Sequence, residues 1–196
     1  MTRAGLRGPR PRPGSIVIGI VRLARGRVDG MQQFGATREA FLASLAPLIA
    51  FPLVGGVLML LAGGGLAVLS DLLATLCALI APLVLSFEVA RLWRRQQFWL
   101  RFATAFNWCQ WIIPVVGFAL LLTFAMLAAL GLPRVVARGG VILALVSYGL
   151  WLHWFLARHG LALSRVRALL MVFVVNLATV LLVAGPRLVS LGAPGT

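Results

Sequence analysis

Long apolar runs alternate with short polar connectors along most of the chain. An α-helix needs about 20 predominantly apolar residues to cross the hydrocarbon core of a bilayer. Five runs meet this requirement, at residues 40–61, 66–90, 102–126, 141–157 and 168–184. The pattern therefore predicts an all-α, polytopic membrane protein with five transmembrane helices. This transmembrane domain is expected to cover residues 37–187 and to be followed by a short tail at 188–196.

The chain before the first run is polar or mixed. Residues 1–14 are rich in Arg, Gly and Pro and cannot build a core, so we expect them to be disordered. Residues 15–36 combine apolar residues with Arg22, Arg25 and Arg27, which is typical of an amphipathic helix lying in the headgroup region. A flexible tether is the alternative for this second segment.

Composition supports the membrane assignment. Of the 196 residues, 61% are hydrophobic and the mean hydropathy is +1.01, which is more apolar surface than a soluble chain of this length can bury. The net charge of +14 would suit a nucleic-acid partner if the arginines formed one polar face. They lie instead in the gaps between apolar runs, so we expect no nucleic-acid partner. Cys77 and Cys109 fall inside apolar runs, and His153 and His159 lack a cluster of further ligands. The pattern therefore predicts no disulfide, metal site or cofactor.

The arginines are distributed unevenly between the two sides of the predicted bundle. Fifteen of the 18 precede the first span or follow the second and fourth spans, whereas Arg134, Arg138 and Arg187 fall on the other side. Because cytoplasmic segments are enriched in Lys and Arg, we predict a cytoplasmic N-terminus, a periplasmic C-terminus and a multi-pass location in the cell inner membrane. The residues expected to contact anionic phospholipids are Arg22, Arg25, Arg27, Arg91, Arg94, Arg95, Arg101, Arg158, Arg165 and Arg167.

The stretch "FNWCQW" places two amide side chains inside the third apolar run. At helical spacing, Ala103, Asn107, Gln110, Pro114 and Gly117 share one face. Small residues and amides are typical of a face that packs against other helices, where an interhelical hydrogen bond contributes about 0.5–2 kcal/mol. Pro114 cannot donate to the carbonyl of Gln110, so that oxygen needs another partner.

Further polar residues fall at a similar depth, in the half of the bilayer nearer the arginine-rich side. The candidate polar cluster comprises Asn107, Gln110, Asn176, Glu88 and His153. One interpretation is hydrogen bonding between packed helices, and the other is a binding site within the bundle. For Glu88, an ion pair with Arg91 is the alternative to a functional carboxylate. For His153, the alternative is a position at the membrane interface.

Two local stretches, "RLARGRVDGMQQFGATREAFLASL" and "FNWCQW", resemble sequences of a group of alphaproteobacterial inner-membrane proteins. Five spans, an inside N-terminus and no sizeable soluble domain also resemble the Yip family of small membrane proteins, including its bacterial members. The similarity covers about residues 22–184. The resemblance implies a role in membrane organisation or partner binding, and it transfers no catalytic residue to this chain.

These observations favour a non-enzymatic integral membrane protein that acts as a scaffold or assembly partner with a basic cytoplasmic face. A small transporter or transporter subunit, with the polar cluster as its site, is the alternative. An enzyme is disfavoured because Ser147 and His153 point about 120° apart on one helix, and because no P-loop or GxGxxG motif occurs in a strand–helix context. The expected partners are the bilayer with its anionic phospholipids and either a membrane protein or a second copy of this chain.

Overall fold

The computed structural model describes residues 13–192, and this part of the chain folds into helices joined by short turns. The helices are α1 (Pro13–Ala24), the 3-10 helix η1 (Val28–Gln33), α2 (Arg38–Leu61), α3 (Gly65–Leu92), α4 (Gln96–Cys109), α5 (Ile112–Ala129), α6 (Arg134–Gly160) and α7 (Arg165–Gly192). Five helical segments are long and apolar enough to cross a membrane, with α4 and α5 together forming the third. The prediction of an all-α, multi-pass membrane protein is therefore confirmed.

Several helices extend beyond the apolar runs that predicted them. The predicted fourth span begins at residue 141, but α6 already begins at Arg134. Helix α7 continues to Gly192, so the start of the expected tail is helical, whereas residues 193–196 lie outside the described part. Backbone hydrogen bonds propagate through polar residues once a helix has formed, whereas the apolar pattern marks only the part that suits hydrocarbon.

The third span is interrupted rather than continuous. Helix α4 ends at Cys109 and α5 begins at Ile112, which leaves Gln110 and Trp111 in a turn between them. The carbonyl oxygen of Gln110 accepts a hydrogen bond from the backbone N–H of Ile113 at 3.2 Å. This contact replaces the bond that Pro114 cannot donate, and the tighter turn that it requires accounts for the break.

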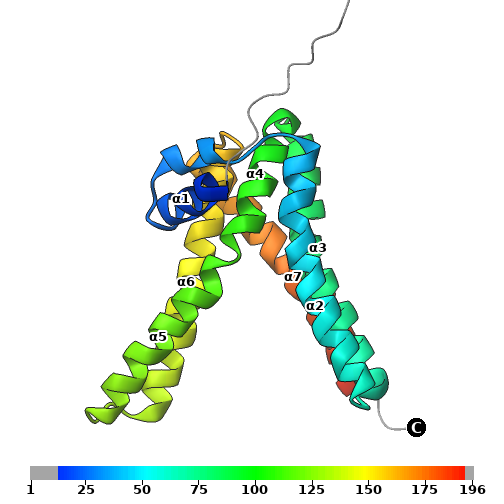
Figure 1. Ribbon diagram of the computed structural model, residues 1–196, viewed down its shortest axis with the longest axis vertical. Helices are drawn as coiled ribbons and strands as arrows, with labels where there is room; N and C mark the ends of the chain where they lie inside the picture. Colours follow the sequence, from blue (N-terminus) through cyan, green and yellow to red (C-terminus); the bar gives the residue numbers. More distant parts are fainter. Residues whose placement is uncertain (1–12, 193–196) are drawn as a thin grey trace, which may run out of the picture.

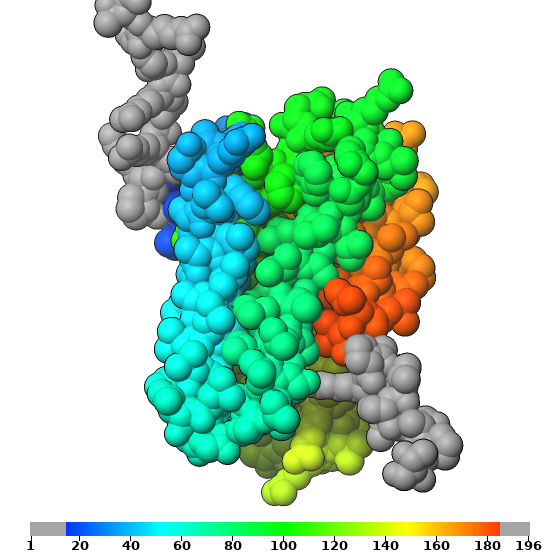
Figure 2. Space-filling view, turned by 90° about the vertical axis from the view of Figure 1, so that its right-hand side faces the viewer, coloured from blue at the N-terminus to red at the C-terminus, as the bar shows by residue number. Residues whose placement is uncertain are grey.

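The described helices form a head with two diverging legs (Figure 1). One leg is the α5–α6 hairpin, and the other consists of α3 with α2 and α7 each packed along it. Helix α5 packs along α6 and, within the described chain, makes no comparable contact with α2, α3 or α7. Turned by 90°, α2, α3 and α7 form one continuous face, and the tip of the α5–α6 hairpin emerges below it (Figure 2). The spans therefore form an open V, whose apex lies below the head.

The N-terminal segment belongs to the head. The main core cluster includes Leu23 of α1, Met31 of η1 and Phe34, the residue that follows η1, and all three are buried. A Cβ on Gly30 would lie 2.9 Å from the backbone oxygen of Gly19, so α1 and η1 pack closely at this point. The Tyr148 hydroxyl of α6 also donates a 3.2 Å hydrogen bond to the carbonyl of Ala24. Residues 15–34 are therefore fixed to the bundle by packing, in contrast to the flexible tether considered from the sequence.

The opposite face of α1 remains apolar and exposed. Val17, Ile18 and Val21 present their side chains to the surroundings while Leu23 is buried. This arrangement suits a helix that packs on the protein with one face and contacts the membrane with the other, at the boundary between headgroups and acyl chains. The first span then begins with Thr37 as its N-cap, since the Thr37 hydroxyl accepts a 3.2 Å hydrogen bond from the backbone N–H of Ala40.

Candidate functional site

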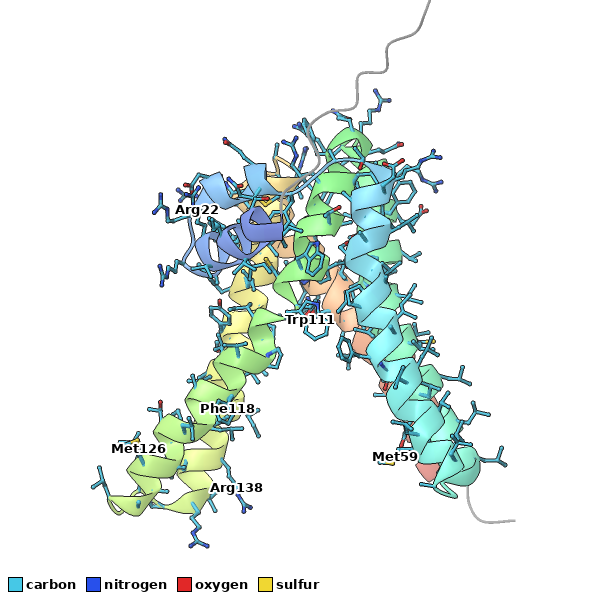
Figure 3. The ribbon with its side chains drawn as sticks, in the orientation of Figure 1. Arg22, Met59, Trp111, Phe118, Met126 and Arg138 are labelled. Carbon is cyan, nitrogen blue, oxygen red and sulfur yellow. The ribbon has the colours of Figure 1, made fainter. Side chains whose placement is uncertain are left out.

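A partly open pocket of about 290 Å³ lies at the apex of the V, where helices of both legs meet below α4. It is lined by Ala78, Pro82, Phe106, Cys109, Gln110, Ile113, Gly149, Leu152, His153, Leu156, Asn176 and Thr179. These residues come from α3, α4, the turn after α4, α5, α6 and α7. Trp111, which marks the same level of the fold, is visible between the legs in Figure 3. We call this cavity the apex pocket.

The polar wall of the apex pocket is built by α6 and α7. The side-chain amide nitrogen of Asn176 lies 3.0 Å from Nδ1 of His153 and 2.7 Å from the carbonyl oxygen of Val172. The ring of Phe106 packs on the His153 ring, with 4.9 Å between ring centroids. His153 is therefore buried and fixed in orientation by two contacts, rather than lying at the membrane interface.

These contacts also assign the hydrogen-bonding role of the imidazole. A carbonyl oxygen faces the Asn176 amide at 2.7 Å, so the group at that position must be the NH2, because two oxygens would repel one another. The same NH2 has a second hydrogen for Nδ1 of His153, which then acts as the acceptor. In the neutral imidazole the proton is therefore on Nε2. That N–H is buried and has no hydrogen-bond partner among the described residues.

The break between α4 and α5 supplies the other side of the apex. Gln110 lies in the break and lines the pocket, so its amide is not part of a continuous packing seam. The ring of the next residue, Trp111, forms a T-shaped contact with the ring of Phe51 of α2, with 5.2 Å between ring centroids. Its indole Nε1 is buried and, like Nε2 of His153, has no partner in the described part of the chain. The two unpaired buried donors thus belong to segments that meet at the apex.

The other two members of the predicted cluster lie elsewhere. Asn107 is buried between α4 and α2, where its amide donates a 3.0 Å hydrogen bond to the Ser44 hydroxyl. This contact is the interhelical packing that the amide spacing predicted. Glu88 is exposed and forms a 2.7 Å ion pair with Arg91, so it does not join His153 and Asn176. Asn107 and Glu88 have a depth similar to that of His153 and Asn176, but their side chains point in other directions. The direction depends on the rotation of each helix about its axis, which depth does not specify.

Most of the arginines expected to touch lipid lie at the head. The connector between α3 and α4, the connector between α6 and α7, and the α1–η1 turn all reach this end of the molecule (Figure 3, where Arg22 is labelled). Arg22 and Arg27 each lie 3.1 Å from the Asp29 carboxylate, and Arg158 lies over the Trp154 ring. Arginines at this end that are exposed and form no salt bridge within the described residues include Arg25, Arg94, Arg101, Arg165 and Arg167. We call this arginine-rich surface the basic end.

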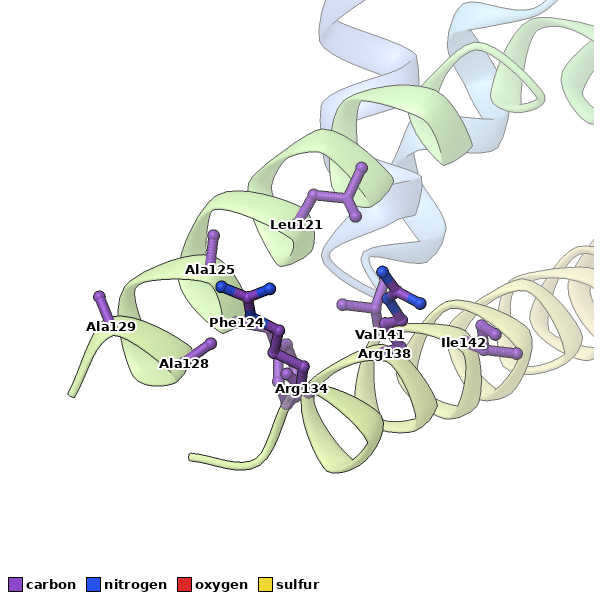
Figure 4. A pocket seen from close by; sticks show the side chains of 10 residues that line it. Leu121, Phe124, Ala125, Ala128, Ala129, Arg134, Arg138, Val141 and Ile142 are labelled. Carbon is purple, nitrogen blue, oxygen red and sulfur yellow. The ribbon is translucent and has the colours of Figure 1, made fainter. Parts of the chain in front are cut away.

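A larger furrow of about 650 Å³ runs along the α5–α6 hairpin at the opposite end. Apolar residues such as Phe124, Ala128 and Val141 form its walls, and Arg134 and Arg138 of α6 lie at its rim (Figure 4). Both arginines are exposed, whereas Ala137 between them is buried. The furrow is therefore an apolar surface with two cations at one edge, and it contains none of the predicted polar cluster.

Sequence reasoning missed some contacts of the site and its support. Cys109 and Thr179 line the apex pocket, and the Trp99 indole donates a 3.1 Å hydrogen bond to the buried Ser86 hydroxyl. The amphipathic spacing of α4 could have indicated Trp99 as a contact, whereas no sequence signal identifies its partner. Within the described residues, no group of three or more His, Cys, Asp or Glu side chains could hold a metal ion.

No family model, curated protein or solved structure matches this chain. The fold and the apolar helices define the class as a helical, multi-pass membrane protein.

Proposed function

We propose that this chain is a non-enzymatic protein of the bacterial inner membrane, with its N-terminus in the cytoplasm, whose basic end binds and organises anionic phospholipids. The observation that carries this proposal is the convergence of arginines from three distant parts of the sequence on one end of the bundle. The positive-inside tendency of membrane proteins supports the orientation. The resemblance to Yip-family proteins is consistent with a role in membrane organisation.

The environment of the arginines fits contact with headgroups. Arg25, Arg165 and Arg167 are exposed, and the nearby α1 helix carries the exposed apolar residues Val17 and Ile18. Apolar side chains can enter the edge of the acyl region while guanidinium groups bind phosphates above it. Each arginine near an anionic surface contributes about 1 kcal/mol of attraction. Several exposed arginines together therefore give a marked preference for anionic over zwitterionic lipid.

Tryptophan fluorescence can test whether anionic lipid gathers at the basic end. All tryptophans lie between the basic end and the apex, at positions 93, 99, 108, 111, 151 and 154. We would reconstitute the full chain in phosphatidylcholine vesicles containing brominated phosphatidylglycerol or brominated phosphatidylcholine, because bromine quenches nearby indoles. We expect stronger quenching by the anionic lipid. The preference should fall as salt rises from about 0.1 M to about 1 M, where the Debye length shortens from about 10 Å to about 3 Å.

The two ends of the molecule offer matched variants. Arg165 and Arg167 lie in the first turn of α7 at the basic end, and Arg134 and Arg138 lie in the first turns of α6 at the other end. Replacing Arg165 and Arg167 by Gln should weaken the anionic-lipid preference by about fivefold per arginine. The double Gln variant of Arg134 and Arg138 should leave tryptophan quenching unchanged. Equal quenching by both brominated lipids in the wild type, or a preference insensitive to salt, would contradict the proposal.

A further inference from the structure

We propose that the furrow along the α5–α6 hairpin is a binding site for one anionic phospholipid of the leaflet opposite the basic end. The lipid phosphate binds the guanidinium groups of Arg134 and Arg138, and one acyl chain lies in the apolar furrow beside them. The furrow and the basic end lie at opposite ends of the molecule and share no residue, so this proposal does not depend on the lipid-organising function.

Two cations without an anionic partner lie at the rim of the furrow. Arg134 and Arg138 both line it, are exposed, and form no salt bridge within the described residues. They are four residues apart on α6, which places them on one face of the helix, about 6 Å apart along its axis (Figure 4). Like charges at this spacing repel one another. A phosphate bound between them replaces this repulsion by charge-assisted hydrogen bonds.

The surroundings of these two arginines favour a headgroup with a net negative charge. The sequence contains no Asp or Glu after Glu88, so α5, α6 and the turn between them offer no carboxylate. The ammonium group of a zwitterionic lipid would therefore lie near two cations and no anion. The headgroup of phosphatidylglycerol carries a phosphate and no amine. The site therefore favours this kind of lipid over phosphatidylcholine or phosphatidylethanolamine.

The shape of the furrow follows from small side chains. Its lining includes Ala125, Ala128 and Ala129 of α5 and Ala137 of α6. Beside them the two helices are in close contact, because a Cβ on Gly140 would collide with the ring of Phe124. This contact holds α5 against α6, and the alanines leave space next to it. The resulting volume of about 650 Å³ lies within the range of small-molecule sites.

The length and depth of the furrow match one leaflet. Its lining extends from Arg134 to Ile142 on α6 and from Ala129 back to Leu121 on α5, which is about 12 Å along each helix axis. Half of the hydrocarbon core is about 15 Å thick. Arg134 is the first residue of α6, directly after the turn that closes the hairpin, so the cations lie at the headgroup end of the furrow. An acyl chain below the phosphate therefore runs along the furrow.

The furrow is open to the bilayer. The α5–α6 leg diverges from the other leg, and within the described chain α5 makes no comparable contact with α2, α3 or α7 (Figure 1). Lipid chains are as apolar as the furrow, so a chain that enters it gains van der Waals contacts rather than a hydrophobic driving force. The furrow therefore positions an acyl chain, whereas the two arginines select the lipid.

Photolabelling of the full chain in phosphatidylcholine nanodiscs tests this proposal. One probe is phosphatidylglycerol with a diazirine in one acyl chain, and the other is phosphatidylcholine with the same chain. Digestion with chymotrypsin, which does not require arginine, followed by mass spectrometry locates the labelled residues. We expect the phosphatidylglycerol probe to label furrow residues such as Leu121 or Val141 in a saturable manner that unlabelled phosphatidylglycerol competes away. The phosphatidylcholine probe should label them weakly and without saturation.

Charge variants test the role of the rim. Replacing Arg134 and Arg138 by Gln should weaken labelling of the furrow by phosphatidylglycerol about fivefold per arginine. The double Lys variant keeps both charges and should retain the preference for the anionic probe. Replacing Arg165 and Arg167 by Gln changes only the basic end and should leave labelling of the furrow unchanged. The failure of this proposal and the failure of the proposed function are therefore observed separately.

A second kind of variant fills the furrow. Ala125 is exposed and lines the furrow, so Ala125→Leu can extend its side chain into the space of the acyl chain. Labelling of Val141 by the anionic probe should then fall to the level given by the phosphatidylcholine probe. Ala119→Leu is the control, because Ala119 is exposed on the same helix, points about 120° away from Ala125 and does not line the furrow. It should label like the wild type.

Three results would overturn the proposal. The first is equal, non-saturable labelling of the furrow by both probes in the wild type, as expected for ordinary bilayer lipid. The second is protection of the furrow from both probes, as expected if a helix of a second copy occupies it. The third is an equal loss of labelling in Ala125→Leu and Ala119→Leu, with thermal unfolding showing that both variants fold.

Discussion

The side-chain amide of Asn107 donates a 3.0 Å hydrogen bond to the hydroxyl of Ser44, across a buried contact between α4 and α2. Ser44 in turn donates to the carbonyl of Phe41 at 2.6 Å, so the two side chains form a short chain of hydrogen bonds. Both residues are at most 1% exposed. The contact joins α4, which lies in the head, to α2, the first span of the leg formed by α2, α3 and α7.

Replacing Asn107 by Leu should therefore destabilise the folded protein by about 0.5–2 kcal/mol, because an interhelical hydrogen bond is lost while the volume is kept. The free energy of unfolding can be measured in bicelles for Asn107→Leu, Ser44→Ala and the double variant. The double-mutant cycle should yield a positive coupling energy between the two residues. Thr123→Val is the control, since the exposed Thr123 hydroxyl bonds only to Ala119 of its own helix. Additive effects of the two substitutions would disprove the coupling.

The fold was largely predictable because the membrane imposes a strong constraint on sequence. A span must be helical and must be apolar over about 20 residues, so the five segments follow from the pattern. The break after Cys109 was not predicted, because the apolar run continues through it without interruption. The signal was Pro114, whose missing N–H had been assigned a consequence for Gln110 but not for the path of the helix. The need of the Gln110 carbonyl for another hydrogen-bond donor was correctly predicted, whereas the interruption of the helix was not.

The candidate site was only partly predictable, for a different reason. Counting residues from a charged connector gives the depth of a side chain, and this correctly placed Gln110, His153 and Asn176 at one level. The direction in which each side chain points depends on the rotation of its helix, which packing against neighbouring helices determines. Glu88 has a similar depth but faces outward with Arg91. Uniformly apolar helices carry little information about rotation, because nearly every face suits lipid.

The hydrogen bond between Trp99 and Ser86 predicts a specific role for one indole nitrogen. Trp99 Nε1 donates to the Ser86 hydroxyl at 3.1 Å, and the ring packs between Phe41 and Phe87. Trp99→Phe should cost about 1 kcal/mol of unfolding free energy, since most aromatic contacts remain and the hydrogen bond is lost. Trp99→Ala should cost about 3–5 kcal/mol, because the ring contacts disappear as well. Thermal unfolding monitored by circular dichroism would measure both, and equal costs would refute the assignment.

The close packing around Gly160 predicts how the N-terminal segment is held. A Cβ at this position would lie 2.9 Å from Cε of Met31 and 3.1 Å from Cβ of Phe102. Gly160→Leu should therefore push η1 and α4 away from α6 and destabilise the head by about 1–3 kcal/mol. Trypsin should then cleave after Arg25 several times faster than in the wild type, because the α1–η1 turn is released. Gly139→Leu, at an open position of the same helix, should be cleaved at the wild-type rate.

The proposed orientation predicts the location of the last residue. Five spans place the two termini on opposite sides of the membrane, so a basic end in the cytoplasm places Thr196 in the periplasm. Alkaline phosphatase fused after Thr196 should be active in a bacterial host, and a green fluorescent protein at the same position should be dark. The same reporters after Gln97, in the first turn of α4 at the basic end, should give the opposite pair of signals. Fluorescence after Thr196 together with active alkaline phosphatase after Gln97 would show that the basic end faces the periplasm, and this result would remove the physical basis for anionic-lipid binding on the cytoplasmic leaflet.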